Sequence, residues 1–105
     1  EYDQSERHLQ EALRIHTRAC GPSHPETATS QVALAALYRA IRRFRDAEPL
    51  YRAGLATRER AFGPDDTLVA QTLNGLGLLL RNMGRIGDAE PLIRRALEIR
   101  TRALG

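Results

Sequence analysis

The run DAEPL occupies residues 46–50 and returns unchanged at residues 88–92. It is the longest identical run in two 42-residue segments that align without a gap, GPSHPETATSQVALAALYRAIRRFRDAEPLYRAGLATRERAF at 21–62 and GPDDTLVAQTLNGLGLLLRNMGRIGDAEPLIRRALEIRTRAL at 63–104. The two segments are identical at 17 positions. A repeat of this length indicates a solenoid, in which each unit buries its apolar face against its neighbours.

Residues 1–20 fit the second half of a preceding unit. Tyr2 lies one period before Phe44, and Leu13 lies one period before Leu55. We therefore expect about two and a half units, entered in the middle of a repeat, and we expect the chain to be part of a longer array.

Apolar residues recur at intervals of three and four along each unit, which is the spacing of an amphipathic helix. Leu34, Leu37, Tyr38 and Ile41 show it in the unit 21–62. The predicted elements are the second helix of a preceding repeat within 1–20, helices over 25–41 and 45–62 in the unit 21–62, and helices over 67–83 and 87–104 in the unit 63–104. Five amphipathic helices with short connections predict an all-α fold, an α–α superhelix of antiparallel helix pairs.

Prolines, glycines and capping residues set these boundaries. Pro49 and Pro91 are tolerated only in a first turn, which places the start of each second helix near residues 45 and 87. His24 or Ser23 is expected to cap the helix that follows Gly21-Pro22, and Asp66 is the corresponding and better cap.

The composition excludes several classes of protein. The net charge of +3 comes from sixteen basic residues, all of them arginine, against thirteen acidic ones, which is well short of the basic stripe of a nucleic-acid binder. No apolar run approaches the ~18 residues of a membrane span. The single cysteine, Cys20, cannot form an internal disulfide and suits a reducing compartment, so we expect a cytoplasmic protein.

The chain resembles a tetratricopeptide repeat protein, in the 42-residue form of kinesin light chains and many bacterial proteins. The family pattern appears as Leu34, Ala35, Tyr38, Arg42, Phe44, Ala47, Tyr51 and Gly54, and again as Leu76, Gly77, Leu80, Gly84, Ile86, Ala89, Ile93 and Ala96. The main departure is Arg42, which stands where the family carries a turn glycine that can take a left-handed conformation.

The resemblance implies a concave groove, lined by the first helix of each unit, that binds an extended peptide or a partner helix. The groove-facing residues would be Thr29, Val32, Ala33, Ala36, Arg39, Ala40, Gln71, Asn74, Gly75, Leu78, Arg81 and Asn82. Asn74 stands where family members carry an asparagine that bonds ligand backbone. Arg39 and Arg81 lie one period apart and favour an acidic ligand, although they are also what a solvated helix surface would carry.

A metal site is the strongest alternative for chemistry. His16 and Cys20 are spaced i, i+4, with His24 just beyond. The repeat argues against it, because His16 shares its position with Arg58, and Cys20 shares its position with Phe62 and is expected to be a small core residue. We expect no metal, no cofactor and no catalytic residues. The recurring Glu6, Glu48 and Glu90 are expected to form salt bridges or to complement helix dipoles.

The sequence thus predicts a non-catalytic module that binds a protein or peptide, with no nucleic-acid or membrane partner. The alternative is a self-associating structural array within a larger signalling protein. It rests on Leu9, Leu13, Ile93 and Leu97, which uncapped ends would leave exposed.

Overall fold

The computed structural model describes residues 2–105, which form five α-helices and no strand. The helices are α1 (Tyr2–Cys20), α2 (Pro25–Ala40), α3 (Phe44–Phe62), α4 (Thr67–Asn82) and α5 (Ile86–Leu104). The predicted all-α superhelix is confirmed, and each predicted range after residue 20 differs from the observed one by a single residue at one end. None of the helices within 2–105 is long and apolar enough to cross a bilayer.

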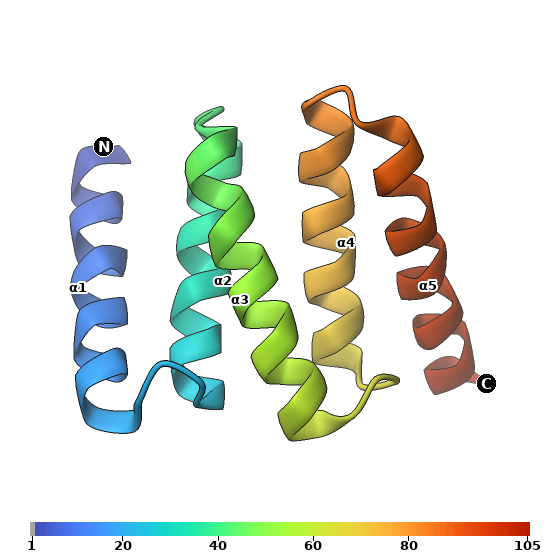
Figure 1. The fold of residues 1–105 in the computed structure, drawn as a ribbon, viewed down its shortest axis with the longest axis horizontal. Coiled ribbons are helices and arrows are strands. Elements are labelled where there is room, and N and C mark those ends of the chain that lie inside the picture. Colours follow the sequence, from blue (N-terminus) through green and yellow to red (C-terminus); the bar gives the residue numbers. More distant parts are fainter. Residues whose placement is uncertain (1) are drawn as a thin grey trace.

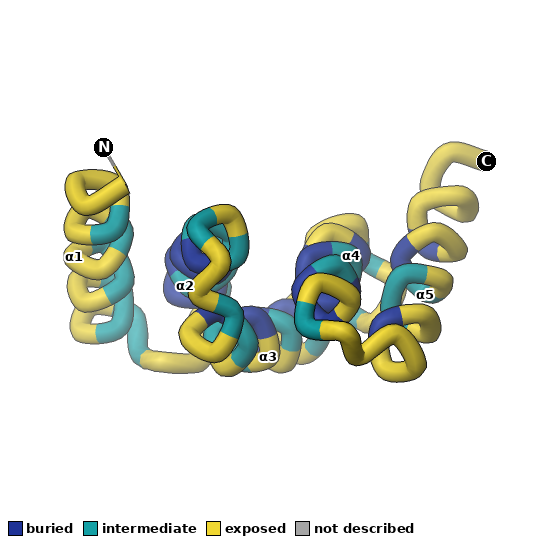
Figure 2. The backbone as a smooth tube through the Cα atoms, turned by 90° about the horizontal axis from the view of Figure 1, so that it is seen from above, coloured by how far each residue is buried: buried dark blue, intermediate teal, exposed yellow. Residues whose placement is uncertain are grey.

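Consecutive helices run antiparallel, one beside the next, as Figure 1 shows. Packing is most extensive between α2 and α3 and between α4 and α5, and α3 also packs on α4. In Figure 2, which is seen from above, α3 lies beneath α2 and reaches toward α4. The helix α3 therefore connects the pair α2 and α3 to the pair α4 and α5. We propose that the pair α2 and α3 corresponds to the repeat unit 21–62 and that the pair α4 and α5 corresponds to the unit 63–104.

The helix ends follow from capping groups. The Nδ1 atom of His24 accepts a hydrogen bond from the Glu26 backbone N–H at 3.1 Å, and Asp66 Oδ1 accepts one from Leu68 at 2.8 Å. Both predicted N-caps are confirmed. Gly21 ends α1 with a φ of +93°, a left-handed conformation that glycine adopts without a Cβ penalty.

Arg42 adopts the same left-handed conformation, with a φ of +65°, that Gly84 adopts one period later with a φ of +80°. A non-glycine residue there costs on the order of 1–2 kcal/mol. The guanidinium of Arg42 lies 5.0 Å from the centre of the Phe44 ring, a cation–π contact that offsets part of this cost. The turn geometry is therefore imposed by the packed helices and not by the residue that occupies it.

The prolines lie deeper in their helices than the sequence indicates. Because α3 begins at Phe44 and α5 at Ile86, Pro49 and Pro91 fall in the second turn and not in the first. Each proline removes one intrahelical hydrogen bond there. Both are exposed, so water can reach the carbonyl left without a partner.

The core lies between the pairs and is made of aliphatic side chains and two tyrosines. Its first buried cluster consists of Leu34, Ala35, Tyr38, Ala47, Tyr51, Leu76, Leu79, Leu80 and Ala89, and a second cluster, of Val69, Ala70, Leu73, Ala96 and Ile99, lies between α4 and α5. Gly77 lets α4 and α5 meet, since an added Cβ would lie 2.6 Å from Ile93 Cγ1 and 3.3 Å from the Ala89 carbonyl oxygen. Gly54 does the same between α3 and α2, where Val32 Cγ2 is 2.6 Å away.

The two end helices are less buried than the middle ones, as Figure 2 shows. No residue of α1 is fully buried. Cys20, expected to be a small core residue, is only half-buried, and Phe62 and Leu104 at the equivalent positions are 43% and 91% exposed. The interpretation of Cys20 as a core residue was wrong, because the last residues of α1, α3 and α5 are half-buried or exposed and do not belong to the core.

Candidate functional site

A groove of about 390 Å³ opens between the two helix pairs. Four helices contribute to its lining: Thr29, Val32, Ala33, Ala36 and Arg39 from α2, Tyr51 and Arg58 from α3, Gln71, Asn74, Gly75 and Leu78 from α4, and Arg100 from α5. Small and aliphatic side chains make the floor, and the polar groups stand among them. A groove with an apolar floor and few polar groups is the usual form of a ligand site.

Nine of the twelve groove residues expected from the sequence line this one cavity. Ala40, Arg81 and Asn82 do not. Arg81 instead lines a second hollow, of about 340 Å³, together with the α5 residues Ile86, Ile93 and Leu97. Arg39 and Arg81 therefore face two different hollows, and only Arg39 belongs to the groove between the pairs.

Three lining residues come from the second helix of a unit, whereas only residues of the first helices were expected in the groove. They are Tyr51, Arg58 and Arg100. One signal in the sequence pointed to Arg58: it continues the apolar stripe of its helix, at the spacing of Leu55 and Tyr51. A charge on an otherwise apolar face is the feature that marks it.

Tyr51 reaches the groove because Gly75 leaves room for its ring. A Cβ on Gly75 would lie 2.7 Å from Tyr51 Cε1 and 3.0 Å from the hydroxyl oxygen. Arg39 Nε then donates a hydrogen bond of 3.3 Å to that hydroxyl. The close approach at Gly75 is thus made by a side chain of the neighbouring helix pair, and it places a tyrosine hydroxyl beside an arginine in the groove.

Arg58 is the most buried charged residue of the groove, only 4% exposed. Its Nη1 donates to Thr72 Oγ1 at 2.9 Å and to Gln71 Oε1 at 3.1 Å, and Nη2 lies 3.5 Å from Thr29 Oγ1. Its Nε is buried without any partner. Burial lowers the pKa of Arg58, because the charged form has lost water, and the charge of Asp66 offsets only part of this effect.

The charged residues that line the groove are all positive. Three arginines line it, and no carboxylate from residues 2–105 does. None of Arg39, Arg58 and Arg100 forms a salt bridge within that part of the chain. Positive charge that the protein leaves uncompensated in a concave surface attracts anionic groups.

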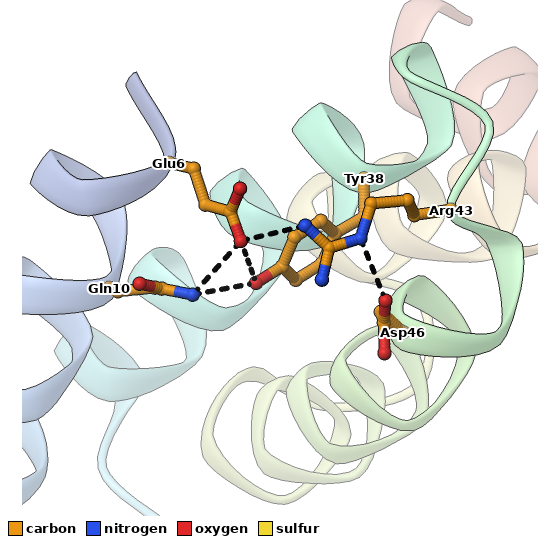
Figure 3. Close-up of polar contacts among 5 residues, drawn as sticks. All are labelled: Glu6, Gln10, Tyr38, Arg43 and Asp46. Atoms are coloured by element: carbon orange, nitrogen blue, oxygen red, sulfur yellow. Dashed lines mark hydrogen bonds and ion pairs between the residues drawn. The ribbon is translucent and has the colours of Figure 1, made fainter. Parts of the chain in front are cut away.

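The arginines that directly precede α3 and α5, Arg43 and Arg85, are compensated by carboxylates, as Figure 3 shows for Arg43. Arg43 donates to Glu6 Oε2 at 2.8 Å and to Asp46 Oδ2 at 2.9 Å, and it lies over the Tyr38 ring. The Tyr38 hydroxyl donates to Glu6 at 3.0 Å and accepts from Gln10 at 2.9 Å. Burial raises the pKa of Tyr38, so it remains the donor to the carboxylate.

The same arrangement recurs one period later. Glu48 accepts from Arg85 at 3.1 Å and from Arg52 at 2.9 Å, and Arg85 also reaches Asp88. Burial favours the neutral form of Glu48, but its two arginines outweigh burial and lower its pKa. The salt-bridging interpretation of these glutamates is confirmed for Glu6 and Glu48. Glu90, the third of the series, has no ion pair among the described residues.

The candidate metal ligands have separate contacts. His16 Nδ1 lies 2.5 Å from Ser30 Oγ, His24 caps α2, and the Cys20 thiol lies 3.8 Å from Glu26 Oε2. The Cys20 pKa is raised by desolvation and by the Glu26 carboxylate. No three His, Cys, Asp or Glu side chains of residues 2–105 are grouped as metal ligands.

Comparison with known proteins agrees with this architecture. The family model of the tetratricopeptide repeat matches residues 1–60 and 46–102. The crystal structure of BtubC (BKLC) from P. vanneervenii superposes with a TM-score of 0.88 at 26% sequence identity, over 99% of this chain and 42% of that one. The chain therefore spans less than half the length of that protein. No curated protein matches it.

Proposed function

Because the chain belongs to the tetratricopeptide repeat family, in its kinesin-light-chain-like type, we propose that it is a non-catalytic module that binds a peptide or a segment of a partner protein in the groove between its two helix pairs. Tetratricopeptide repeats generally mediate protein–protein interactions. The observation that carries the proposal is the groove itself, with an apolar floor and polar groups from four helices.

The lining suits an extended segment. Asn74 offers both a donor and an acceptor to a main-chain amide, and the Tyr51 hydroxyl adds a second polar group. Val32, Ala36 and Leu78 provide apolar contact for a side chain between them. The uncompensated arginines favour an acidic segment over a neutral or basic one. A cytoplasmic location belongs to the same proposal and is supported by the lone Cys20.

Groove occupancy is tested by filling the groove. Ala36→Trp places an indole on the floor, whereas Ala56→Trp adds the same group to an exposed position of α3 outside the lining. Peptides selected from a displayed library of random 12-residue segments should bind Ala56→Trp as they bind the wild type. They should bind Ala36→Trp at least about tenfold more weakly, at similar helicity. Equal affinity for both variants would place the binding surface elsewhere.

The acidic preference is tested by two arginines that the fold separates. Arg39→Glu reverses a charge inside the groove, and Arg81→Glu reverses the equivalent charge in the other hollow. Acidic library peptides should lose affinity for Arg39→Glu and retain it for Arg81→Glu. A loss of the same size in both variants would mean that long-range attraction, and not the groove, selects the ligand.

Self-association is the second candidate, and the outer face of α5 favours it. Ile86 and Leu97 are 46% and 64% exposed and border the second hollow. Leu9, Leu13 and Ile93, which were expected to be exposed as well, are half-buried against the core. Sedimentation at several concentrations tests this candidate: association that is abolished by Leu97→Glu would support it, and a constant monomer mass would reject it.

A further inference from the structure

The outer side of α5, which faces away from α4, carries an apolar surface that no helix of residues 2–105 covers. In Figure 1, α5 is the outermost helix of the row, and among the described helices it packs on α4 alone. Leu97 and Ile86 are exposed on this side and line the second hollow together with the half-buried Ile93. Apolar side chains that gather at one hollow, unlike single exposed ones, mark an interaction site.

The equivalent sides of α1 and α3 are covered, because α1 packs on α2 and α3 packs on α4. On α3 the apolar residues of this side are Tyr51 and Leu55, which pack in the core. Ile93 and Leu97 occupy the same positions one period later, on α5. The outer side of α5 therefore has the residues with which a second helix binds a following first helix.

An acidic residue marks one end of each of these junctions. Arg43 Nη1 donates to Glu6 Oε2 at 2.8 Å, as Figure 3 shows, and Arg85 Nη1 donates to Glu48 Oε1 at 3.1 Å. In both pairs the arginine lies 37 positions after the glutamate, just beyond the end of the helix that covers it. Glu90 is the next glutamate of the series, and no ion pair among residues 2–105 includes it. The junction on α5 lacks its arginine.

The helices that cover α1 and α3 share one pattern of residues. Each presents a hydroxyl to the second helix, Ser30 beside His16 at 2.5 Å and Thr72 beside Arg58 at 2.9 Å. Apolar residues follow four, eight and eleven positions after the hydroxyl, on one face of the helix, and the junction arginine follows thirteen positions after it. The apolar residues are Leu34, Tyr38 and Ile41 in the first copy and Leu76, Leu80 and Met83 in the second.

We propose that the outer side of α5 binds an amphipathic helix of a partner protein that carries this same pattern. Ile93 and Leu97 would receive its apolar residues, and Glu90 would accept hydrogen bonds from its arginine. The helix would run antiparallel to α5, as α2 runs to α1 and α4 to α3. The apolar contact would supply most of the affinity, and the ion pair would fix the register. Glu90, Ile93 and Leu97 are not part of the lining of the groove between the pairs, so this inference goes beyond the proposed function.

The pattern also bears on the source of the helix. Within this chain it occurs at 30–43 and 72–85, and these two segments belong to junctions that are already formed, with α1 and with α3. A second copy could offer its pattern to α5 only by opening one of its own junctions. The helix therefore comes from another protein.

The first test uses this chain's own pattern as the probe. A peptide with the sequence of residues 25–44 is labelled with fluorescein and held helical by a lactam bridge between positions 32 and 36, on the side opposite the apolar stripe. Fluorescence anisotropy should show saturable binding to the full chain. Leu97→Glu should weaken it at least about tenfold, since it places a charge among the apolar contacts. Absence of binding at about 1 mM, or equal affinity for Leu97→Glu, would overturn the proposal.

The second test reverses the charges of the expected ion pair. Glu90→Arg should weaken binding of the probe about two- to fivefold, the range of a partly exposed ion pair. A probe that carries Arg43→Glu should bind Glu90→Arg more tightly than it binds the wild type. Glu98→Arg is the matched control, because Glu98 is an exposed residue of α5 that does not line the second hollow. Equal effects of Glu90→Arg and Glu98→Arg would reject the proposed register.

Two comparisons separate this inference from the functions proposed above. A library peptide whose binding is weakened by Ala36→Trp occupies the groove, and it should not displace the helical probe; displacement would place the probe in the groove and overturn the inference. Probe binding without any groove ligand in the library would support the inference and reject peptide binding in the groove. Self-association that Leu97→Glu abolishes, without binding of the probe, would make a second copy the occupant and overturn the inference.

Discussion

Replacing Arg58 by methionine should make the protein more stable, although the substitution removes three hydrogen bonds. Methionine has a similar length and no charge, and exchanging a buried ionic group for apolar side chains of similar volume stabilises proteins by about 1–4 kcal/mol where the charge is poorly compensated. Two of the three acceptors, on Thr29 and Gln71, are exposed and can bond to water. The third, Thr72 Oγ1, keeps its bond to the Leu68 carbonyl.

These contributions set the expected size of the effect. The lost hydrogen bonds cost little, because each acceptor retains another partner or water. Removing the buried charge should therefore outweigh them and raise the free energy of unfolding by about 1 kcal/mol. For a domain of about 100 residues this corresponds to a rise in melting temperature of roughly 4–8 °C. Circular dichroism melts and urea titrations measure it, with Arg60→Met, an exposed arginine of the same helix, expected within about 0.5 kcal/mol of the wild type.

The same experiment can refute the reasoning. A loss of 1 kcal/mol or more in Arg58→Met, at unchanged stability of Arg60→Met, would mean that the guanidinium is a structural bridge between α3 and α4. A gain in stability together with a loss of acidic-peptide binding would identify Arg58 as a residue kept for recognition at the expense of stability.

The structure also predicts the effects of four further substitutions. Gly77→Ala should lower the free energy of unfolding measured by urea titration by about 1 kcal/mol, because the clash with α5 outweighs the gain in helix propensity. Gly87→Ala is the matched control: its Cβ would meet nothing within 4 Å, so this substitution should raise the free energy of unfolding. Gly84→Ala should cost about 1 kcal/mol, because φ is +80°; an unchanged melting temperature would contradict this. Glu48 has a lowered pKa, so its stabilisation is present above pH 4.5 and is lost as pH falls through the folded-state pKa; Glu48→Gln should flatten the acid side of the stability curve, and identical curves would contradict the role of its two arginines.

The architecture could be predicted from the sequence because both copies of the repeat show the same helical pattern, so each copy supports the assignment made for the other. The stripes that include Leu34 and Leu76 place the core, and His24 and Asp66 mark equivalent helix starts. The boundaries that were missed, at Phe44 and Ile86, depend on how far the first turn is stabilised by neighbouring helices. That information is tertiary, and a proline rule applied to one helix cannot supply it.

The lining of the groove was predicted only in part, because the family pattern describes residues of the first helices. It does not describe the side chains of the second helices that extend between the units. Thr29, Asn74 and Leu78 were placed in it by their helix face. Tyr51 enters the groove from α3, and it can do so only because Gly75 on α4 has no side chain. Such a contact joins residues of two units, so it is absent from the periodicity of either one.

The repeat is most informative where its copies present different chemistry at one position. Tyr51 and Arg39 place a hydroxyl and a guanidinium together in the groove, whereas their equivalents one period later, Ile93 and Arg81, place an aliphatic chain beside the guanidinium. The backbone positions are equivalent, so the fold cannot account for the difference. Under the proposed function, the groove and the second hollow would therefore recognise different segments of a ligand with the same scaffold. Ligand selectivity should then depend on the residues that differ between the two copies. Tyr51→Ile should therefore give the groove between the pairs the ligand selectivity of the second hollow, where Ile93 lies at the equivalent position.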